Sequence, residues 1–163
     1  MKTEVLNQEE ILRICNRFAF QILENSTDSN VIHIVGIKEK GFEIAKIIEN
    51  ELKSITNKSI ILRSIKINKK NPKDLVLSNL KSNEKIDTIF LVDDVLNSGK
   101  TLIYSLSFLL NFNFKSIRTL VLIDRNHKQF PVKVDYKGIS LSTNISDNIQ
   151  LLNNNHHLKA VLF

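Results

Sequence analysis

Continuous apolar runs alternate with amphipathic segments along most of this chain. Near the N-terminus apolar residues recur every three or four positions, so that Ile11, Cys15 and Phe18 fall on one side of a helix. The stretch 31–37 is instead apolar at nearly every position, as in a strand that is covered on both faces. The pattern predicts helices at residues 8–25, 41–52 and 101–110, and strands at residues 31–37, 59–67, 88–92 and 117–123.

This alternation predicts an α/β fold, namely a single-domain parallel sheet with helices on both faces. The chain has 163 residues, the length of one domain, and residues 1–163 are treated as a single unit. The polar, lysine-rich stretch 68–85 is expected to be a flexible loop with a short helix at residues 75–80. Short strands are expected at residues 132–136 and 158–163.

The composition is that of an ordinary globular protein, since 42% of the residues are apolar and 25% are charged. No run approaches the roughly 18 apolar residues of a membrane span, so no membrane partner is expected. The single cysteine, Cys15, excludes an intramolecular disulfide and favours a reducing cytoplasm. The net charge of +6 favours an anionic partner, which can be a nucleic acid, a nucleotide or a polyphosphate.

Two adjacent acids, Asp93 and Asp94, follow the predicted strand at residues 88–92. Ligands of parallel sheets bind outside the carboxyl ends of the strands, where carboxylates can accept hydrogen bonds from sugar hydroxyls. A short turn then leads into a predicted helix, and the free backbone amides at the start of a helix can hold a phosphate. The segment therefore predicts a holder for a sugar phosphate, whose phosphate side consists of Asn97, Ser98, Gly99, Lys100 and Thr101.

The same residues also fit a purely structural turn, with Asp94 and Ser98 as capping residues. Adjacent carboxylates repel each other, and capping does not require both of them, so the ligand-binding interpretation is favoured. The segment lacks the G-x-x-x-x-G-K-[ST] pattern, which excludes a Walker-type ATPase.

Two further strand ends carry polar turns that we expect at the same edge of the sheet. The first lies between two glycines and contains two lysines, so that it can hold a second anion such as pyrophosphate. The second includes a histidine, which alone would be an ordinary surface residue but here can help to cover a planar base. The first turn is Gly36, Ile37, Lys38, Glu39, Lys40 and Gly41, and the second is Asp124, Arg125, Asn126 and His127.

The sequence Val-Asp-Asp-Val-Leu-Asn-Ser-Gly-Lys-Thr at residues 92–101 resembles the signature with which type I phosphoribosyltransferases bind phosphoribosyl pyrophosphate (PRPP). Within this superfamily the chain looks most similar to the bacterial pyrimidine-operon attenuator proteins that are also uracil phosphoribosyltransferases. The narrower resemblance rests on residues 35–41, on Leu-Ile-Asp-Arg-Asn-His-Lys-Gln-Phe-Pro at residues 122–131, and on Val-Asp-Tyr-Lys-Gly at residues 134–138. It covers most of the chain.

The resemblance implies a type I phosphoribosyltransferase fold with a small β-rich hood at about residues 124–146. It makes Asp93 and Asp94 the catalytic acids that bind the ribose hydroxyls, residues 97–101 the 5′-phosphate site and residues 36–41 the pyrophosphate loop. It places residues 124–127 in the hood over the base. The implied reaction converts uracil and PRPP into UMP and pyrophosphate, with Mg²⁺ as the cofactor that accompanies PRPP and that the two acids can contact.

The resemblance also implies a homo-oligomer and an mRNA leader as a second partner, contacted by Arg13 and Arg17. Several positions depart from the family pattern. Glu39 stands where a small hydroxyl residue is expected, and Asn16 and Phe20 replace a threonine and a histidine of the RNA-contact helix. Two alternatives therefore stay open: a weakly catalytic or non-catalytic nucleotide-sensing RNA-binding regulator of pyrimidine genes, and a degenerate paralogue that acts only through interaction partners.

Overall fold

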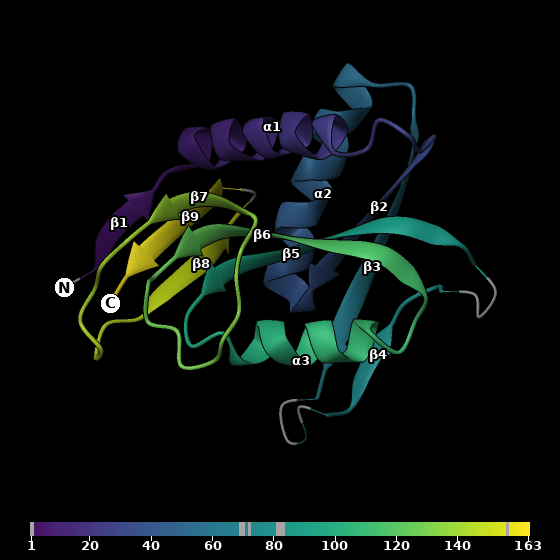
Figure 1. The fold of residues 1–163 in the computed structure, drawn as a ribbon. Helices are drawn as coiled ribbons and strands as arrows, with labels where there is room; N and C mark the ends of the chain where they lie inside the picture. The colour runs from purple at the N-terminus through teal and green to yellow at the C-terminus, as the bar shows by residue number, and fades with distance from the viewer. Residues whose placement is uncertain (1, 69–70, 72, 81–83, 156) are drawn as a thin grey trace.

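The computed structural model describes residues 2–68, 71, 73–80, 84–155 and 157–163. Three helices and two sheets make up this part of the chain (Figure 1). The helices are α1 (Gln8–Glu24), α2 (Lys38–Ile55) and α3 (Lys100–Leu109). The strands are β1 (Thr3–Leu6), β2 (Val31–Ile37), β3 (Ser59–Ile67), β4 (Leu75–Leu77), β5 (Ile86–Leu96), β6 (Phe114–Asp124), β7 (Tyr136–Ser140), β8 (Ile149–Asn154) and β9 (His157–Leu162).

The larger sheet has six strands in the order β4-β3-β2-β5-β6-β7. All neighbouring strands in it are parallel except β4, which runs antiparallel to β3. Because β3, β2, β5 and β6 are adjacent and parallel, their carboxyl ends meet at one edge, and the segments that follow them come together there. The predicted α/β class with a parallel sheet is confirmed.

Helices cover both faces of this sheet (Figure 1). Helices α1 and α2 pack on one face, where Phe18 and Ile48 share an apolar core with Phe90 of β5. Helix α3 packs on the opposite face, where Leu102 shares a second core with Leu91 of β5. Side chains alternate between the two faces of a strand, so the neighbours Phe90 and Leu91 belong to different cores. The central strands are mostly apolar because both of their faces are covered.

The smaller sheet is antiparallel, has the order β1-β9-β8 and joins the two ends of the chain. We expected a β-rich hood at residues 124–146, but this stretch supplies only β7, which pairs with β6 in the larger sheet. The small sheet instead takes its strands from residues 3–6 and 149–162, because β9 pairs with both β1 and β8. The predicted strand at residues 158–163 corresponds to β9.

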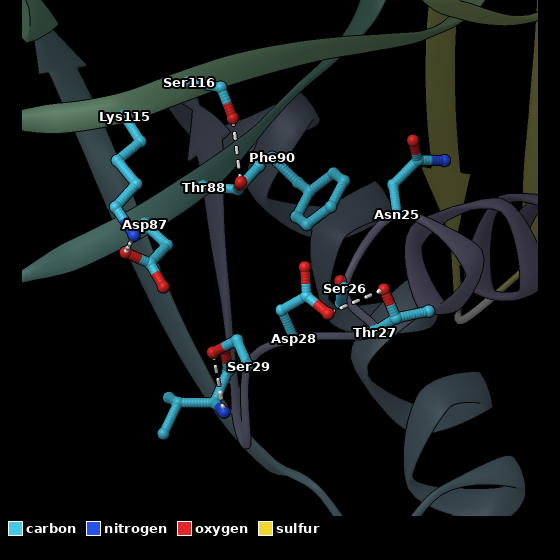
Figure 2. A pocket seen from close by; sticks show the side chains of 11 residues that line it. Asn25, Ser26, Thr27, Asp28, Ser29, Asp87, Thr88, Phe90, Lys115 and Ser116 are labelled. Atoms are coloured by element: carbon cyan, nitrogen blue, oxygen red, sulfur yellow. Dashed lines mark hydrogen bonds and ion pairs between the residues drawn. The ribbon is translucent and has the colours of Figure 1, made fainter.

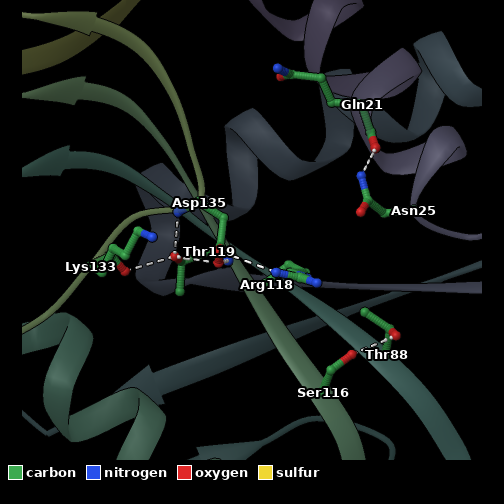
Figure 3. Close-up of polar contacts among 8 residues, drawn as sticks. All are labelled: Gln21, Asn25, Thr88, Ser116, Arg118, Thr119, Lys133 and Asp135. Carbon is green, nitrogen blue, oxygen red and sulfur yellow. Dashed lines mark hydrogen bonds and ion pairs between the residues drawn. The ribbon is translucent and has the colours of Figure 1, made fainter.

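Asp135 fixes the start of β7 against β6 (Figure 3). Its carboxylate accepts a hydrogen bond of 2.9 Å from the backbone N–H of Thr119 and lies 3.4 Å from the guanidinium of Arg118. Its own backbone N–H donates to the carbonyl oxygen of Thr119 at 3.1 Å. Pairing with β6 therefore begins at Tyr136, and the strand that we predicted at residues 132–136 is shifted toward the C-terminus.

Other predicted bounds also change. Strand β5 continues to Leu96 because it stays paired with β6, so the two acids lie within the strand and not after it. Residues 75–77 form β4 along the edge of the sheet, so the short helix expected at residues 75–80 is wrong. Within the predicted flexible loop at 68–85, residues 69–70, 72 and 81–83 lie outside the described part of the chain.

Candidate functional site

A cavity of about 640 Å³ opens at the carboxyl ends of β2, β3 and β5. It brings together the acids of β5 and the lysine-containing turn after β2, two segments that the sequence predicted as parts of one site. Its lining residues are Ile37, Lys38, Glu39, Lys40, Phe42, Ser64, Lys66, Ile67, Asp93 and Asp94. Both carboxylates and ammonium groups therefore line this cavity.

Asp93 and Asp94 differ in their exposure although they are adjacent. Asp93 is 8% exposed, and its carboxylate accepts a 2.9 Å hydrogen bond from the backbone N–H of Asp94, which is half-buried. Burial and the charge of Asp94 raise the pKa of the Asp93 carboxyl well above its ordinary value, and Lys38 opposes this shift. Asp94 is thus the more accessible acid for a hydroxyl of a ligand, whereas the charge of Asp93 is costly to the fold.

Two glycines let α2 approach the ends of β2 and β5 closely. A Cβ atom on Gly41 would lie 2.6 Å from the carbonyl oxygen of Val92, and one on Gly36 would lie 2.4 Å from the Cα atom of Phe42. We predicted that these glycines delimit a pyrophosphate loop with the helix starting at Gly41. The structure corrects the start of the helix, because α2 begins at Lys38, and the glycines allow it to pack against the sheet.

The junction between β2 and α2 keeps features that suit an anion. Lys38 has a left-handed backbone with φ of 54°, which is uncommon for a residue with a side chain. The N-cap residue of α2, Ile37, provides no side-chain cap, and the first N–H groups of a helix have no acceptor within the helix. Lys40 lies 3.2 Å from Glu43, and Glu39 lines the cavity beside the two lysines.

Sequence analysis missed two polar residues of this cavity, Ser64 and Lys66 on β3. No motif marks them, since they lie within an ordinary run of alternating residues. The available signal was topological, because residues 59–65 of β3 pair in parallel with β2 and β3 ends at the same edge of the sheet. Lys66 adds a third ammonium group to the lining of the cavity.

Asn97, Ser98 and Gly99 form the turn between β5 and α3. Gly99 has φ of 84° and precedes α3 without a side-chain cap, so the first N–H groups of this helix point into the turn. Of these groups, the N–H of Lys100 lies 3.3 Å from the hydroxyl oxygen of Ser98. The turn, which ends at Thr101, has the backbone of a phosphate site, although its residues do not line the 640 Å³ cavity.

The segment 124–127 lies against this turn, but its side chains bind other parts of the protein. Asp124 is buried at the end of β6 and pairs with Lys128 at 3.2 Å and Lys137 at 3.5 Å. Burial alone would raise the pKa of Asp124, but the backbone N–H of Asn126 and these two lysines lower it overall. The ring of His127 lies 2.5 Å from the carbonyl oxygen of Thr143. Asn126 has a left-handed backbone with φ of 58°.

The two arginines of α1 have different surroundings. Arg13 is exposed and pairs with Glu9 of the same helix, at 2.9 Å. Arg17 donates hydrogen bonds to the carbonyl oxygens of Lys137 at 3.1 Å and Gly138 at 2.9 Å, so it joins α1 to β7.

On the inner side of the same helix, burial and the charge of Glu51 raise the pKa of the Cys15 thiol to about 12, which makes it a poor nucleophile.

A second, smaller cavity of about 230 Å³ lies at the opposite edge of the sheet (Figure 2). It is bordered by the loop after α1 and by the first residues of β5 and β6. Asp87 and Lys115 form an ion pair of 2.8 Å across its rim, and the hydroxyls of Thr88 and Ser116 lie 2.8 Å apart. None of the residues that the sequence predicted as a site lines this cavity.

The acidic side chains of this cavity are possible ligands for a metal ion. Within the described part of the chain, no group of three or more histidine, cysteine or acidic side chains could hold a metal. Magnesium usually takes one or two carboxylates from the protein and further oxygens from a phosphate substrate. Asp93 and Asp94, which share the 640 Å³ cavity with anion-binding groups, fit that pattern.

Comparison with known proteins defines the class. The Phosphoribosyl transferase domain family matches residues 1–153, and the chain belongs to this family. It is similar to the bifunctional protein PyrR of Elusimicrobium minutum, with 32% identity over 88% of this chain and 85% of the relative. It is also 29% identical to the bifunctional protein PyrR of Haemophilus ducreyi, over 93% of this chain and 89% of the relative. The resemblance that we inferred from residues 35–41, 92–101 and 122–138 is confirmed.

Solved structures show the same fold. The hypoxanthine phosphoribosyltransferase of Trypanosoma cruzi has a TM-score of 0.78 with 15% identity, over 97% of this chain and 95% of that one. A hypoxanthine phosphoribosyltransferase from Staphylococcus aureus has a TM-score of 0.72 with 16% identity, over 88% of this chain and 80% of that one. Among the described residues, no helix has the length and apolar character needed to cross a membrane.

Proposed function

We propose that this phosphoribosyltransferase transfers phosphoribose from PRPP to uracil and forms UMP and pyrophosphate. The observation that carries the proposal is the position of Asp94 at one edge of the sheet, where it shares a cavity with the first turn of α2 and precedes the turn into α3 on the same strand. A sugar that carries a phosphate on one side and a pyrophosphate on the other requires such an arrangement. The PyrR relatives support a pyrimidine as the acceptor base.

In this proposal each segment binds one part of PRPP. Asp94, with Asp93 behind it, accepts hydrogen bonds from the ribose hydroxyls, and the amides and hydroxyls of residues 97–101 hold the 5′-phosphate. Lys38, Lys40 and the first turn of α2 bind the pyrophosphate. Residues 124–127 lie on the base side, with their backbone as the surface toward the ligand, since the side chains of Arg125 and His127 bond to other residues.

The reaction forms a bond between C1 of the ribose and N1 of uracil while the bond from C1 to the pyrophosphate oxygen breaks. The bonding electrons leave with pyrophosphate, and the N1 proton of uracil passes to solvent. Positive groups around the cavity stabilise the charge that develops on the leaving pyrophosphate, and fixed positions hold the two reactants together. Asp93 or Asp94 would hold Mg²⁺ together with PRPP, and the ion would supply charge neutralisation.

RNA binding is a second candidate function. The net charge of +6 and the exposed Arg13 favour it, and Arg17 adds a guanidinium that α1 already uses to hold β7. A chain that binds nucleotides at the 640 Å³ cavity and RNA along α1 would be a nucleotide-sensing regulator. We further propose a homo-oligomer in the cytoplasm, the location that the single cysteine favours.

Thermal unfolding with and without ligands tests the proposed site. PRPP and UMP, each with Mg²⁺, are expected to raise the melting temperature, because a ligand that binds the native state stabilises it by about 2.7 kcal/mol at 100 times its Kd. Asp94→Asn should abolish the shift. Asp87→Asn is the matched control, since Asp87 lies at the opposite end of β5 in an exposed ion pair, and it should leave the shift intact. No shift with PRPP or UMP in the wild-type protein would overturn the proposal.

A further inference from the structure

Arg125 is buried, with 6% of its surface exposed, and it connects three segments of the chain near the phosphate turn. One guanidinium nitrogen donates to the side-chain oxygen of Asn97 at 2.8 Å. The others donate to the hydroxyl of Thr143 at 3.0 and 2.8 Å and to the carbonyl oxygen of Asn144 at 3.1 Å. Arg125 also donates its backbone N–H to the carbonyl oxygen of Leu96 at 3.1 Å. The residue is therefore fixed on both its backbone and its side chain.

All three acceptors of the guanidinium are uncharged, and no carboxylate within the described part of the chain forms an ion pair with Arg125. The adjacent acid, Asp124, pairs with Lys128 and Lys137 instead. A buried cation without a counter-charge is costly. Hydrogen bonds to neutral acceptors offset part of this cost, and a negative group nearby would offset more.

A site for such a negative group adjoins this contact. Asn97 begins the turn in which Gly99 precedes α3 with no side-chain cap. Segment 124–130 supports the same turn, since the backbone N–H groups of Gln129 and Phe130 donate to the carbonyl oxygen of Ser98 at 2.8 and 3.1 Å. The turn is thus held at Ser98 by backbone contacts and at Asn97 by the guanidinium of Arg125.

We infer that Arg125 is a positioning residue: through the side chain of Asn97 it holds the phosphate turn in its binding geometry, and it links this turn to Thr143. This inference rests on the proposed function for its effect on ligand binding. It assigns Arg125 a task different from the contact with the base that the sequence suggested. The ring of His127, bonded to the carbonyl oxygen of Thr143, strengthens the same link.

Three single variants distinguish the positioning role of Arg125 from the general effect of removing one positive charge from the protein. Arg125→Gln should weaken UMP binding by about 10- to 100-fold, the usual effect of losing a charge-assisted hydrogen bond. Thr143→Val, a milder change that leaves Arg125 in place, should weaken it by about 3- to 10-fold. Arg118→Gln is the matched control, because it removes one positive charge from β6, the strand that precedes Arg125, outside the site, and should change UMP affinity by less than about twofold. Calorimetric titration with UMP measures all three.

A double-mutant cycle tests whether Arg125 acts through Asn97. The variant that combines Asn97→Ala with Arg125→Gln should bind UMP about as weakly as the weaker of the two single variants. Losses that multiply instead, or wild-type affinity in Arg125→Gln, would overturn the inference. Either of these two results can be obtained only if the wild-type protein binds UMP. Either would therefore overturn the role of Arg125 without contradicting the proposed function.

Amide hydrogen exchange without ligand gives an answer that does not depend on the proposed function. Residues 97–101 should exchange at least about tenfold faster in Arg125→Gln than in the wild-type protein and in Arg118→Gln, because the turn loses its support. Unchanged exchange in these residues would overturn the positioning role even if the wild-type protein bound no nucleotide. Thr143→Val, with a smaller increase at the same residues, provides the test if Arg125→Gln does not fold.

Discussion

Gly41 lies so close to Asp93 that a Cβ atom on Gly41 would stand 3.4 Å from the Oδ1 atom of Asp93. The same atom would stand 2.6 Å from the carbonyl oxygen of Val92, which belongs to the backbone and cannot rotate away. The first turn of α2 is therefore held against the acid-bearing part of β5. This contact keeps the proposed pyrophosphate side and the ribose side of the site at a fixed separation.

Gly41→Ala is expected to destabilise the protein by about 2 kcal/mol, because α2 must move away from β5 to admit the methyl group. Activity should fall as well, since the movement separates Lys38 from Asp93. Urea unfolding and initial rates measure the two effects. Asn50→Ala, on an exposed position of the same helix, is the control and should change neither. A Gly41→Ala variant with wild-type stability would contradict the close packing.

Asp93→Asn should stabilise the protein while it lowers activity. The pKa of Asp93 is raised by burial and by Asp94, so the native state binds more protons than the unfolded state above the ordinary pKa of 3.8. Stability from this group is therefore present at low pH and is lost as the pH rises through the native pKa. At neutral pH the substitution should add about 1 kcal/mol to the free energy of unfolding. Chemical unfolding at several pH values measures this, and a loss of stability at neutral pH would contradict the argument.

Stability should also decline on mild acidification because of His33. Its ring lies 2.8 Å from the guanidinium of Arg63, which pairs with Glu84 at 2.6 Å. Burial lowers the pKa of His33 below 6.5, Arg63 lowers it further, and Glu84 and Asp87 oppose this. The native state then binds fewer protons than the unfolded state, so stability falls as the pH drops below the unfolded value of 6.5.

The measurement is urea unfolding on both sides of pH 6.5, with His33→Gln as the variant. The variant should lose less stability than the wild-type protein between about pH 7.5 and pH 5.5. His157→Gln, at an exposed site, serves as the comparison. Equal losses in the wild-type protein and His33→Gln would show that His33 does not cause the decline.

The two arginines of α1 should respond differently to alanine substitution. Arg17→Ala removes two hydrogen bonds to β7 and should cost about 1 to 2 kcal/mol of stability. Arg13→Ala removes one exposed ion pair and should cost less than about 0.5 kcal/mol. If α1 binds RNA, Arg13→Ala should also weaken binding and reduce its salt dependence, whereas Glu24→Gln should not. RNA titrations at several salt concentrations measure this; equal salt slopes would rule out contact through Arg13.

The sequence predicted the order of the main elements because the strands of the large sheet are buried on both faces. Residues 31–37 are apolar except for His33, and residues 120–123 are apolar throughout, which is unusual outside such a sheet. The sequence did not predict β4, because a strand of three residues at a sheet edge is too short to show an alternation of apolar and polar positions. It also ended β5 too early, because adjacent acids are rarely found inside a strand.

Within the candidate site, the sequence correctly predicted which segments come together. It was less successful in predicting the contacts that their side chains make. The acids and the turn after β2 share one cavity, as their positions at strand ends indicated. The burial of Arg125 could not be foreseen, because a charged residue after a strand is usually exposed. Its acceptors on residues 143–144 come from a segment whose fold depends on tertiary contacts.

The most direct test of the proposed function is the conversion of labelled uracil to UMP by the purified protein with PRPP and Mg²⁺. UMP should form in the wild-type protein and in Asp87→Asn, stop on removal of Mg²⁺ by a chelator, and fall by at least about 100-fold in Asp94→Asn with folding intact. Absence of UMP formation in a wild-type protein that still binds PRPP would contradict the proposed enzyme activity. Equal rates in Asp94→Asn and the wild-type protein would contradict the site assigned to it.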